Sequence, residues 1–216
     1  MRAISQPHRR SMTTYVLAGV AAAAIIGLVV VVLLATRGGG SQPTPTPTPS
    51  STPSLPLLAA AGSPSGSAID GIQCQTNEQV AYHIHAHIAV YVGGQQRSVP
   101  EGVGIEPPRQ EVSTGEGPYV VSGACYYWLH THTDDGIIHI ESPTRKLYTL
   151  GNFFDIWGHP LSTSQVGPDS GTLIIYVSGK KYTGDPRVIT LTAHELIQID
   201  VNTDVAPQPF TFPVGL

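Results

Sequence analysis

The sequence predicts a mainly β domain with one short helix, folded as an antiparallel sandwich or a barrel-like structure. Alternating residue types over 81–92 are typical of a strand with two different faces. Gly-containing pairs follow several apolar segments, as expected for hairpin turns. The 216 residues include 23 Gly and 19 Pro, and only 12% are charged, a composition that favours strands, turns and linkers. We expect this domain to be extracytoplasmic, behind a single transmembrane helix and a Pro/Thr-rich stalk.

An apolar run near the N-terminus predicts a membrane anchor. Residues 15–35 are 21 uncharged, mostly apolar residues, and about 20 helical residues cross a bilayer core of about 30 Å. The run is longer than a signal-peptide core, and no A-x-A cleavage site follows it. Three Arg precede it and one follows it. The positive-inside rule therefore places residues 1–14 in the cytoplasm and the C-terminal part outside the cell membrane.

Residues 36–67 predict a disordered linker rich in Pro, Thr, Ser and Gly. Alternating Pro and Thr favour an extended polyproline II spacer, and this composition offers too little apolar surface for a core. Residues 68–216 contain all 15 acidic residues of the chain against seven basic ones. They lack the basic stripe of a nucleic-acid-binding protein. We expect no nucleic-acid partner, and the sequence identifies no protein partner beyond the membrane itself.

Residues 68–216 are numerous enough to bury a core as one β-rich domain. Apolar, β-branched and aromatic segments predict its strands at 81–92, 97–99, 119–121, 125–132, 137–141, 173–177 and 195–201. Turns are predicted at Gly93-Gly94, Asp135-Gly136 and Ser178-Gly179. Residues 195–201 alternate apolar side chains with Gln198 and Asp200, which is the pattern of a half-buried strand.

One short helix is predicted over residues 150–157. Thr149 can cap its N-terminus, because a Thr hydroxyl accepts a hydrogen bond from a free backbone N–H of the first turn. Gly158 can end it, since Gly readily adopts the left-handed conformation of a C-terminal cap. Pro160 follows, where a helix does not easily resume.

Histidines are the most informative residues of the chain, and eight of the nine follow the apolar run. His83, His85 and His87 lie two residues apart in one predicted strand, so their side chains share a face. The opposite face carries only Ile, Ala and Val and must pack in the core. The histidine face is therefore expected to have a role other than core packing.

A second histidine group is predicted in a hairpin. His130 and His132 precede its turn, and His139 lies on the return strand. With a two-residue loop at 134–135, His130 pairs with His139, and with the loop one residue later His132 pairs with it. In both cases these histidines and Glu141 share one face. A three-residue loop would turn His139 to the other face.

The two groups together predict a transition-metal site. Opposed residues on paired strands have Cβ atoms about 4.5–5.5 Å apart, a spacing that suits metal–nitrogen bonds of about 2.0–2.1 Å. The expected ligands are His83, His85, His87, His130, His132 and His139. Additional candidates are Glu141, Asp134 and His159. Histidines packed on aromatic rings and a pH sensor remain alternative interpretations, and the sequence leaves open whether the six form one site or two.

Cysteine and methionine content narrows the choice of metal. Cys74 and Cys125 are the only thiols, and in an oxidising compartment they are expected to form a disulfide that leaves no thiolate for a metal. Both Met residues precede residue 15, so the domain offers no thioether ligand for copper. A site of imidazoles, completed by a carboxylate or water, favours Zn²⁺ or Cu²⁺.

Four segments resemble a family of uncharacterised, membrane-anchored bacterial proteins with extracytoplasmic domains. They read YHIHAHIAVYV, CYYWLHTHTDDGIIHIESP, TLGNFFDIWG and PFTFPVGL. The likeness covers most of residues 70–216. It implies an anchored domain outside the cytoplasm and, since no activity is assigned to that family, it implies no function.

Three classes of function remain open. The first is a metal-binding or metal-delivery module displayed outside the membrane. The second is a metal-dependent enzyme, either a hydrolase or hydratase with three His ligands or a copper oxidoreductase, with Glu141 as the candidate general base. The third is a structural or interaction module with packed histidines. The sequence contains no nucleophile elbow, phosphate-binding loop or dinucleotide fingerprint.

Overall fold

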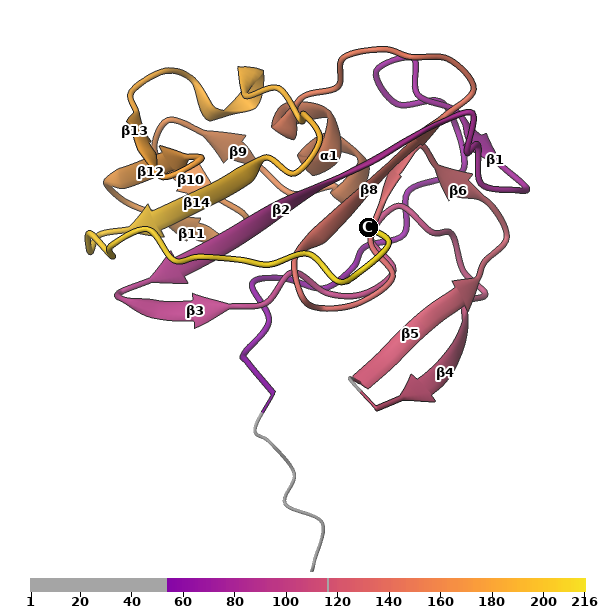
Figure 1. The fold of residues 1–216 in the computed structure, drawn as a ribbon, viewed down its shortest axis with the longest axis horizontal. Helices are drawn as coiled ribbons and strands as arrows, with labels where there is room; N and C mark the ends of the chain where they lie inside the picture. The colour runs from indigo at the N-terminus through magenta and orange to yellow at the C-terminus, as the bar shows by residue number, and fades with distance from the viewer. Residues whose placement is uncertain (1–53, 116) are drawn as a thin grey trace, which may run out of the picture. The chain divides into compact units, whose positions relative to one another are not determined.

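The computed structural model describes residues 54–115 and 117–216 (Figure 1). The predicted cytoplasmic segment, the predicted transmembrane helix at 15–35 and most of the predicted linker lie outside these residues. Among the described residues, no helix is long and apolar enough to span a membrane. This part of the chain is mainly β with one α-helix, as predicted.

The largest sheet has seven strands in the order β13-β12-β14-β2-β8-β7, with β3 paired to one end of β2. Their bounds are β2 (Tyr82–Val92), β3 (Gln95–Arg97), β7 (Leu129–His130), β8 (Ile137–Ser142), β12 (Leu173–Val177), β13 (Lys180–Tyr182) and β14 (Leu196–Val201). The sheet stays open, so the predicted barrel alternative is wrong. The fold is also not purely antiparallel, because β14 runs parallel to β2. A tight hairpin forces two strands to be antiparallel. The long connection between β2 and β14 allows them to pair in parallel.

The remaining strands form three small antiparallel sheets. Their members are β1 (Cys74–Gln75) with β6 (Tyr126–Tyr127), β4 (Gln110–Thr114) with β5 (Gly117–Ser122), and β9 (Leu161–Ser162), β10 (Gln165–Val166) and β11 (Asp169–Ser170). The single strand predicted at 125–132 is thus divided, because β6 pairs with β1 whereas β7 pairs with β8. The predicted disulfide between Cys74 and Cys125 is present beside the β1–β6 pair.

The helix α1 (Leu150–Trp157) matches the prediction at both ends. The Thr149 side chain accepts a hydrogen bond from the Asn152 backbone N–H, and Gly158 ends the helix with φ at 78°. The buried residues of α1 share one apolar cluster with the apolar face of β2, including Ile88. Burying each large side chain of this kind stabilises a fold by about 1.5–3 kcal/mol. The histidine face of β2 points away from this core. A short 3₁₀ helix, η1 (Pro186–Val188), precedes β14.

The folded unit begins before the predicted boundary at residue 68. Leu58 is only 4% exposed and belongs to the main core. Its backbone N–H donates to Ser98 O at 2.8 Å, and Trp157 Nε1 donates to Ala60 O at 2.7 Å. The predicted disorder of the linker is therefore wrong over residues 54–67. The Pro/Thr-rich composition of the whole segment conceals the short apolar stretch LPLLAAAG, which supplies a core residue.

The C-terminal segment, residues 202–216 after β14, covers the second face of β14 and β2 (Figure 1, yellow). Val205 N donates to Asp200 Oδ2 at 2.9 Å, and Gln208 N donates to Gln198 Oε1 at 2.8 Å. Both side chains on β14 are therefore buried, and the predicted half-buried character of this strand is wrong. The polar face is satisfied by hydrogen bonds from the chain terminus instead of by water.

Candidate metal centre

Three histidines form a row across β2, β8 and β7. His85 pairs with His139, and His139 pairs with His130. Their ring centroids lie 4.6 Å and 5.5 Å apart along the row. Directly opposed residues point to the same side of a sheet, so the two H-x-H segments converge as predicted. The register is the one expected for a turn centred on 134–135, although the loop itself runs from 131 to 136.

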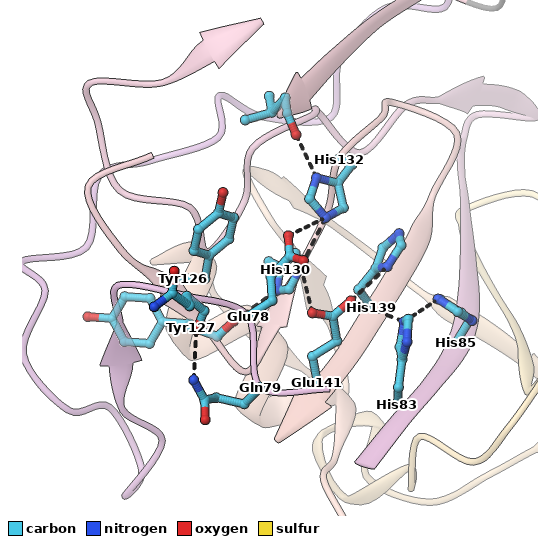
Figure 2. A network of polar contacts seen from close by, with 12 residues as sticks. Glu78, Gln79, His83, His85, Tyr126, Tyr127, His130, His132, His139 and Glu141 are labelled. Carbon is cyan, nitrogen blue, oxygen red and sulfur yellow. Dashed lines mark hydrogen bonds and ion pairs between the residues drawn. The ribbon is translucent and has the colours of Figure 1, made fainter. Parts of the chain in front are cut away.

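Glu141 occupies the middle of the histidine cluster (Figure 2). It lies opposite His83 across β2 and β8 and is only 3% exposed. Its Oε1 atom is 3.0 Å from His83 Nε2 and 3.4 Å from His139 Nδ1, and its Oε2 atom is 3.9 Å from His130 Nε2. Among the described residues, the ion-pair partners of Glu141 are all histidines. A buried carboxylate without a permanent cation beside it is unfavourable, so this arrangement favours a bound cation.

His132 reaches the cluster from the loop after β7. Its Nε2 atom lies 3.2 Å from His130 Nε2 and 3.4 Å from Glu78 Oε1. The ring of Tyr119 on β5 stacks on His132 with centroids 4.8 Å apart. Glu78 lies in the loop between β1 and β2, and it was not among the predicted ligands because no sequence pattern links this loop to the histidines. Burial raises the pKa of Glu78, and the nearby Glu141 raises it further.

The hydrogen bonds of His130 and His132 define their tautomers. His130 Nδ1 donates to Tyr127 O at 2.9 Å, and His132 Nδ1 donates to Val120 O at 2.6 Å. A carbonyl oxygen can only accept, so each ring carries its proton on Nδ1. The two Nε2 lone pairs therefore face each other across 3.2 Å. This contact is repulsive between neutral rings, and a cation between the two nitrogens would make it attractive.

Burial keeps three imidazoles of the cluster neutral, those of His85, His130 and His139. Burial, with a smaller contribution from the neighbouring histidines, lowers the pKa of His85 to about 4, of His130 to about 3 and of His139 to about 2. Neutral imidazole is the form that binds transition metals. At neutral pH the ring nitrogens that carry no proton are therefore available as ligands.

Two buried atoms of the cluster have no hydrogen-bond partner. They are His139 Nδ1 and Glu141 Oε2. His139 is 8% exposed, so neither atom is compensated by bulk water. An unsatisfied buried polar atom costs about 1–3 kcal/mol. A metal ion coordinated by these atoms would remove that cost, and the donor set fits one, since it consists of imidazole nitrogens and carboxylate oxygens.

The donors fall into two overlapping groups. In each group the ligand atoms all lie within 4.8 Å of one another. One group contains His130, His132, His139 and Glu141, and the other contains His83, His85 and His139. This part of the chain could therefore hold a metal ion at a buried His/Glu cluster.

Three predicted candidates lie outside both groups. His87 is opposite Ile137, contacts Asp135 O through Nε2 at 3.0 Å and stacks on Phe210. His159 packs against the Trp157 ring at the end of α1 and lies 3.2 Å from Ala60 O. Asp134 belongs to the loop before β8 and to neither donor group. Five of the six predicted histidines therefore belong to a donor group, and His87 belongs to neither.

A cavity of about 350 Å³ reaches the cluster at His139. Its walls include Tyr119, Thr133 and Ile137, together with Pro213 and Leu216 of the C-terminal segment. Small molecules can therefore approach one edge of the histidine cluster. The terminal residues that cover β2 also form part of this wall.

No family model, curated protein or solved structure matches this chain. No activity or ligand set is therefore transferred to it from another protein. The chemistry of the site follows from its own donor atoms, their burial and their hydrogen bonds.

Proposed function

We propose that this protein binds a transition-metal ion, Cu²⁺ or Zn²⁺, through its buried histidine cluster. The ligands are drawn from His83, His85, His130, His132, His139 and Glu141. The observation that carries this proposal is the 3.2 Å contact between two unprotonated nitrogens, Nε2 of His130 and Nε2 of His132. Two ligands of a tetrahedral ion with bonds of about 2.0–2.1 Å lie about 3.3 Å apart. The two rings are thus already spaced as neighbouring ligands of one ion.

The proposal places the metal-binding domain outside the cytoplasm, held by the apolar run at 15–35 as a membrane anchor. The Cys74–Cys125 disulfide supports this, since such bonds persist in oxidising compartments. The Arg residues before the apolar run support the same orientation. The resemblance to anchored bacterial proteins agrees with it. The role is then to bind, store or deliver a metal at the cell surface.

A metal-dependent enzyme is the second candidate, and the cavity beside His139 is the observation that favours it. A catalytic metal needs an open coordination position that a substrate can reach. The cavity volume of about 350 Å³ suits a small substrate. If the protein is such an enzyme, Glu141 serves as a metal ligand and not as the predicted general base, because three imidazoles surround its carboxylate.

Metal analysis of the full-length chain tests the proposal. The protein is purified without a polyhistidine tag, stripped with a chelator, reloaded with Cu²⁺ or Zn²⁺ and dialysed. We expect bound metal in stoichiometric amount in the wild type and in the control His159→Ala, and its loss in His85→Ala/His132→Ala. Circular dichroism verifies that each variant is folded. A folded wild type that retains neither ion after loading would exclude the metal-binding function.

A further inference from the structure

We propose that the cluster is a dinuclear centre, in which the Glu141 carboxylate bridges two metal ions and Glu78 is an additional ligand. This inference rests on the proposed metal binding and adds the number of ions, the bridge and a ligand from another loop. It divides the donors into two halves. The outer half contains His83, His85 and His139 with Glu141 Oε1, and the inner half contains His130, His132 and Glu78 with Glu141 Oε2.

The number of donors exceeds what one ion can use. Five histidines and Glu141 take part in the two donor groups, whereas a protein-bound Zn²⁺ ion usually has four ligands. Ligand atoms of a single ion with bonds of about 2.0–2.1 Å lie no more than about 4.2 Å apart. The donors instead separate into groups that share His139. Two centres of coordination therefore fit the arrangement better than one.

The outer half has the spacings of one coordination shell. His83 Nε2 is 2.9 Å from His85 Nε2 and 3.0 Å from Glu141 Oε1. His139 Nδ1 is 3.4 Å from the same oxygen. Neighbouring ligands in a tetrahedral shell lie about 3.3 Å apart. The His83 side chain is 37% exposed, so this half lies next to solvent, through which an ion can enter.

The inner half is assembled from residues 130–132, the loop between β1 and β2, and Glu141 on β8. His130 lies on β7, His132 follows it, and Glu78 comes from the loop between β1 and β2. His132 Nε2 is 3.2 Å from His130 Nε2 and 3.4 Å from Glu78 Oε1. Backbone carbonyls hold both rings through Nδ1, the outer-shell hydrogen bond that usually orients a histidine ligand. This half is therefore preorganised before any ion binds.

Glu141 joins the two halves through its two oxygens. Oε1 faces the outer half, at 3.0 Å from His83 Nε2, and Oε2 faces the inner half, at 3.9 Å from His130 Nε2. The two buried atoms without hydrogen-bond partners fall one in each half, as His139 Nδ1 and Glu141 Oε2. Each half thus contains one buried ligand atom that has no hydrogen-bond partner. In two-metal sites the ions lie about 3.5–4 Å apart, a separation that a bridging carboxylate can span.

Copper loading with electron paramagnetic resonance tests the bridge directly. The full-length chain is loaded with Cu²⁺, and metal content and spin intensity are measured on the same sample. We expect two copper ions per chain, and a spin intensity well below the copper content because the bridged ions couple. In His83→Ala/His85→Ala we expect one copper ion per chain with the full spin intensity of an isolated ion. The control His159→Ala should behave as the wild type.

The variant Glu78→Gln tests the added ligand. The Glu78 side chain is 36% exposed, so we expect this variant to fold as the wild type does, which circular dichroism verifies. We expect one of the two copper ions to bind at least ten-fold more weakly. Two uncoupled ions in the wild type would overturn the bridge. A wild type that binds only one copper ion per chain, with that ion still bound in His83→Ala/His85→Ala, would overturn the dinuclear centre and leave the proposed function intact. Absence of bound copper, together with absence of bound zinc after zinc loading, would instead overturn the proposed function itself.

Discussion

The ring of His87 stacks on Phe210, with centroids 3.6 Å apart and an interplanar angle of 14°. This contact joins the histidine face of β2 to the C-terminal segment. It also explains why the third histidine of the H-x-H-x-H segment is in neither donor group, because its ring is packed between the segment and the loop carbonyl of Asp135. One face of a single strand thus carries two candidate ligands and one packing residue.

Replacing Phe210 should weaken the fold without removing the metal. We expect Phe210→Ala to lower the free energy of unfolding by about 1 kcal/mol, since an aromatic pair contributes about 0.5–1.5 kcal/mol beyond its buried area. Urea unfolding measures the change, and metal analysis of the same variant should give the wild-type content. A Phe210→Ala protein that is folded but has lost its metal would show that the C-terminal segment belongs to the site.

The stability of the metal-free protein, kept in the presence of a chelator, should fall as the pH decreases from about 6.5 to about 4. Burial lowers the pKa of His87 from 6.5 to about 4. Between these values the unfolded chain binds a proton that the folded chain does not, so acidification favours unfolding. The contribution of His87 is at most about 3.5 kcal/mol, at about 1.4 kcal/mol for each pH unit.

The variant His87→Phe isolates that contribution, because it keeps an aromatic ring against Phe210 and cannot be protonated. Its unfolding free energy, measured by urea titration at several pH values in the presence of chelator, should depend less steeply on pH than that of the wild type. Equal slopes in the two proteins would show that His87 does not titrate between these pH values.

Bound metal should raise the melting temperature of the protein. A ligand at 100 times its dissociation constant stabilises the folded state by about 2.7 kcal/mol. For a domain of this size, 1 kcal/mol corresponds to about 2–4 °C, so we expect a rise of about 5–10 °C. Differential scanning calorimetry with Zn²⁺ and with chelator measures it. The control His159→Ala should show the same rise and His85→Ala/His132→Ala should not, whereas a rise in all three proteins would indicate binding elsewhere.

Removing the disulfide should destabilise the fold and weaken metal binding together. Cys74 and Cys125 are 51 residues apart in sequence, and closing a loop of this length contributes about 4 kcal/mol in the chain-entropy model. The bond also holds β1, which leads into the loop that carries Glu78. We expect Cys74→Ala/Cys125→Ala to lose stability and to bind metal less tightly. Calorimetry and metal titration measure the two effects, and unchanged affinity would separate the disulfide from the site.

The segment before the predicted domain boundary should contribute to stability through one residue. Leu58 is 4% exposed, whereas its neighbour Leu57 is 52% exposed. We expect Leu58→Ala to lower the free energy of unfolding by about 2–5 kcal/mol, as for other large-to-small core substitutions. Leu57→Ala is the matched control and should change it by less than about 0.5 kcal/mol. Equal effects of the two substitutions would contradict the packing of this segment against the core.

The local sequence pattern was sufficient to predict much of the fold and much of the candidate site. The period of two in β2 identified both of its faces, because side-chain direction in a strand depends only on sequence parity. The Thr149 cap and the Gly158 end of α1 depend on the hydrogen bonds and backbone freedom of those residues alone. Cross-strand parity likewise brought Glu141 into the group of His130 and His139, because directly paired residues share a face.

Contacts between distant segments could be seen only in the tertiary structure. Sequence parity places His87 beside His85, but Phe210 lies far along the chain, and its stacking on His87 removes that histidine from the donor groups. The approach of Glu78 to His132 likewise depends on how one loop is packed against another. The sequence by itself therefore determined which side chains share a face. The tertiary structure decided which of them meet, because such contacts depend on packing between segments that no local period relates.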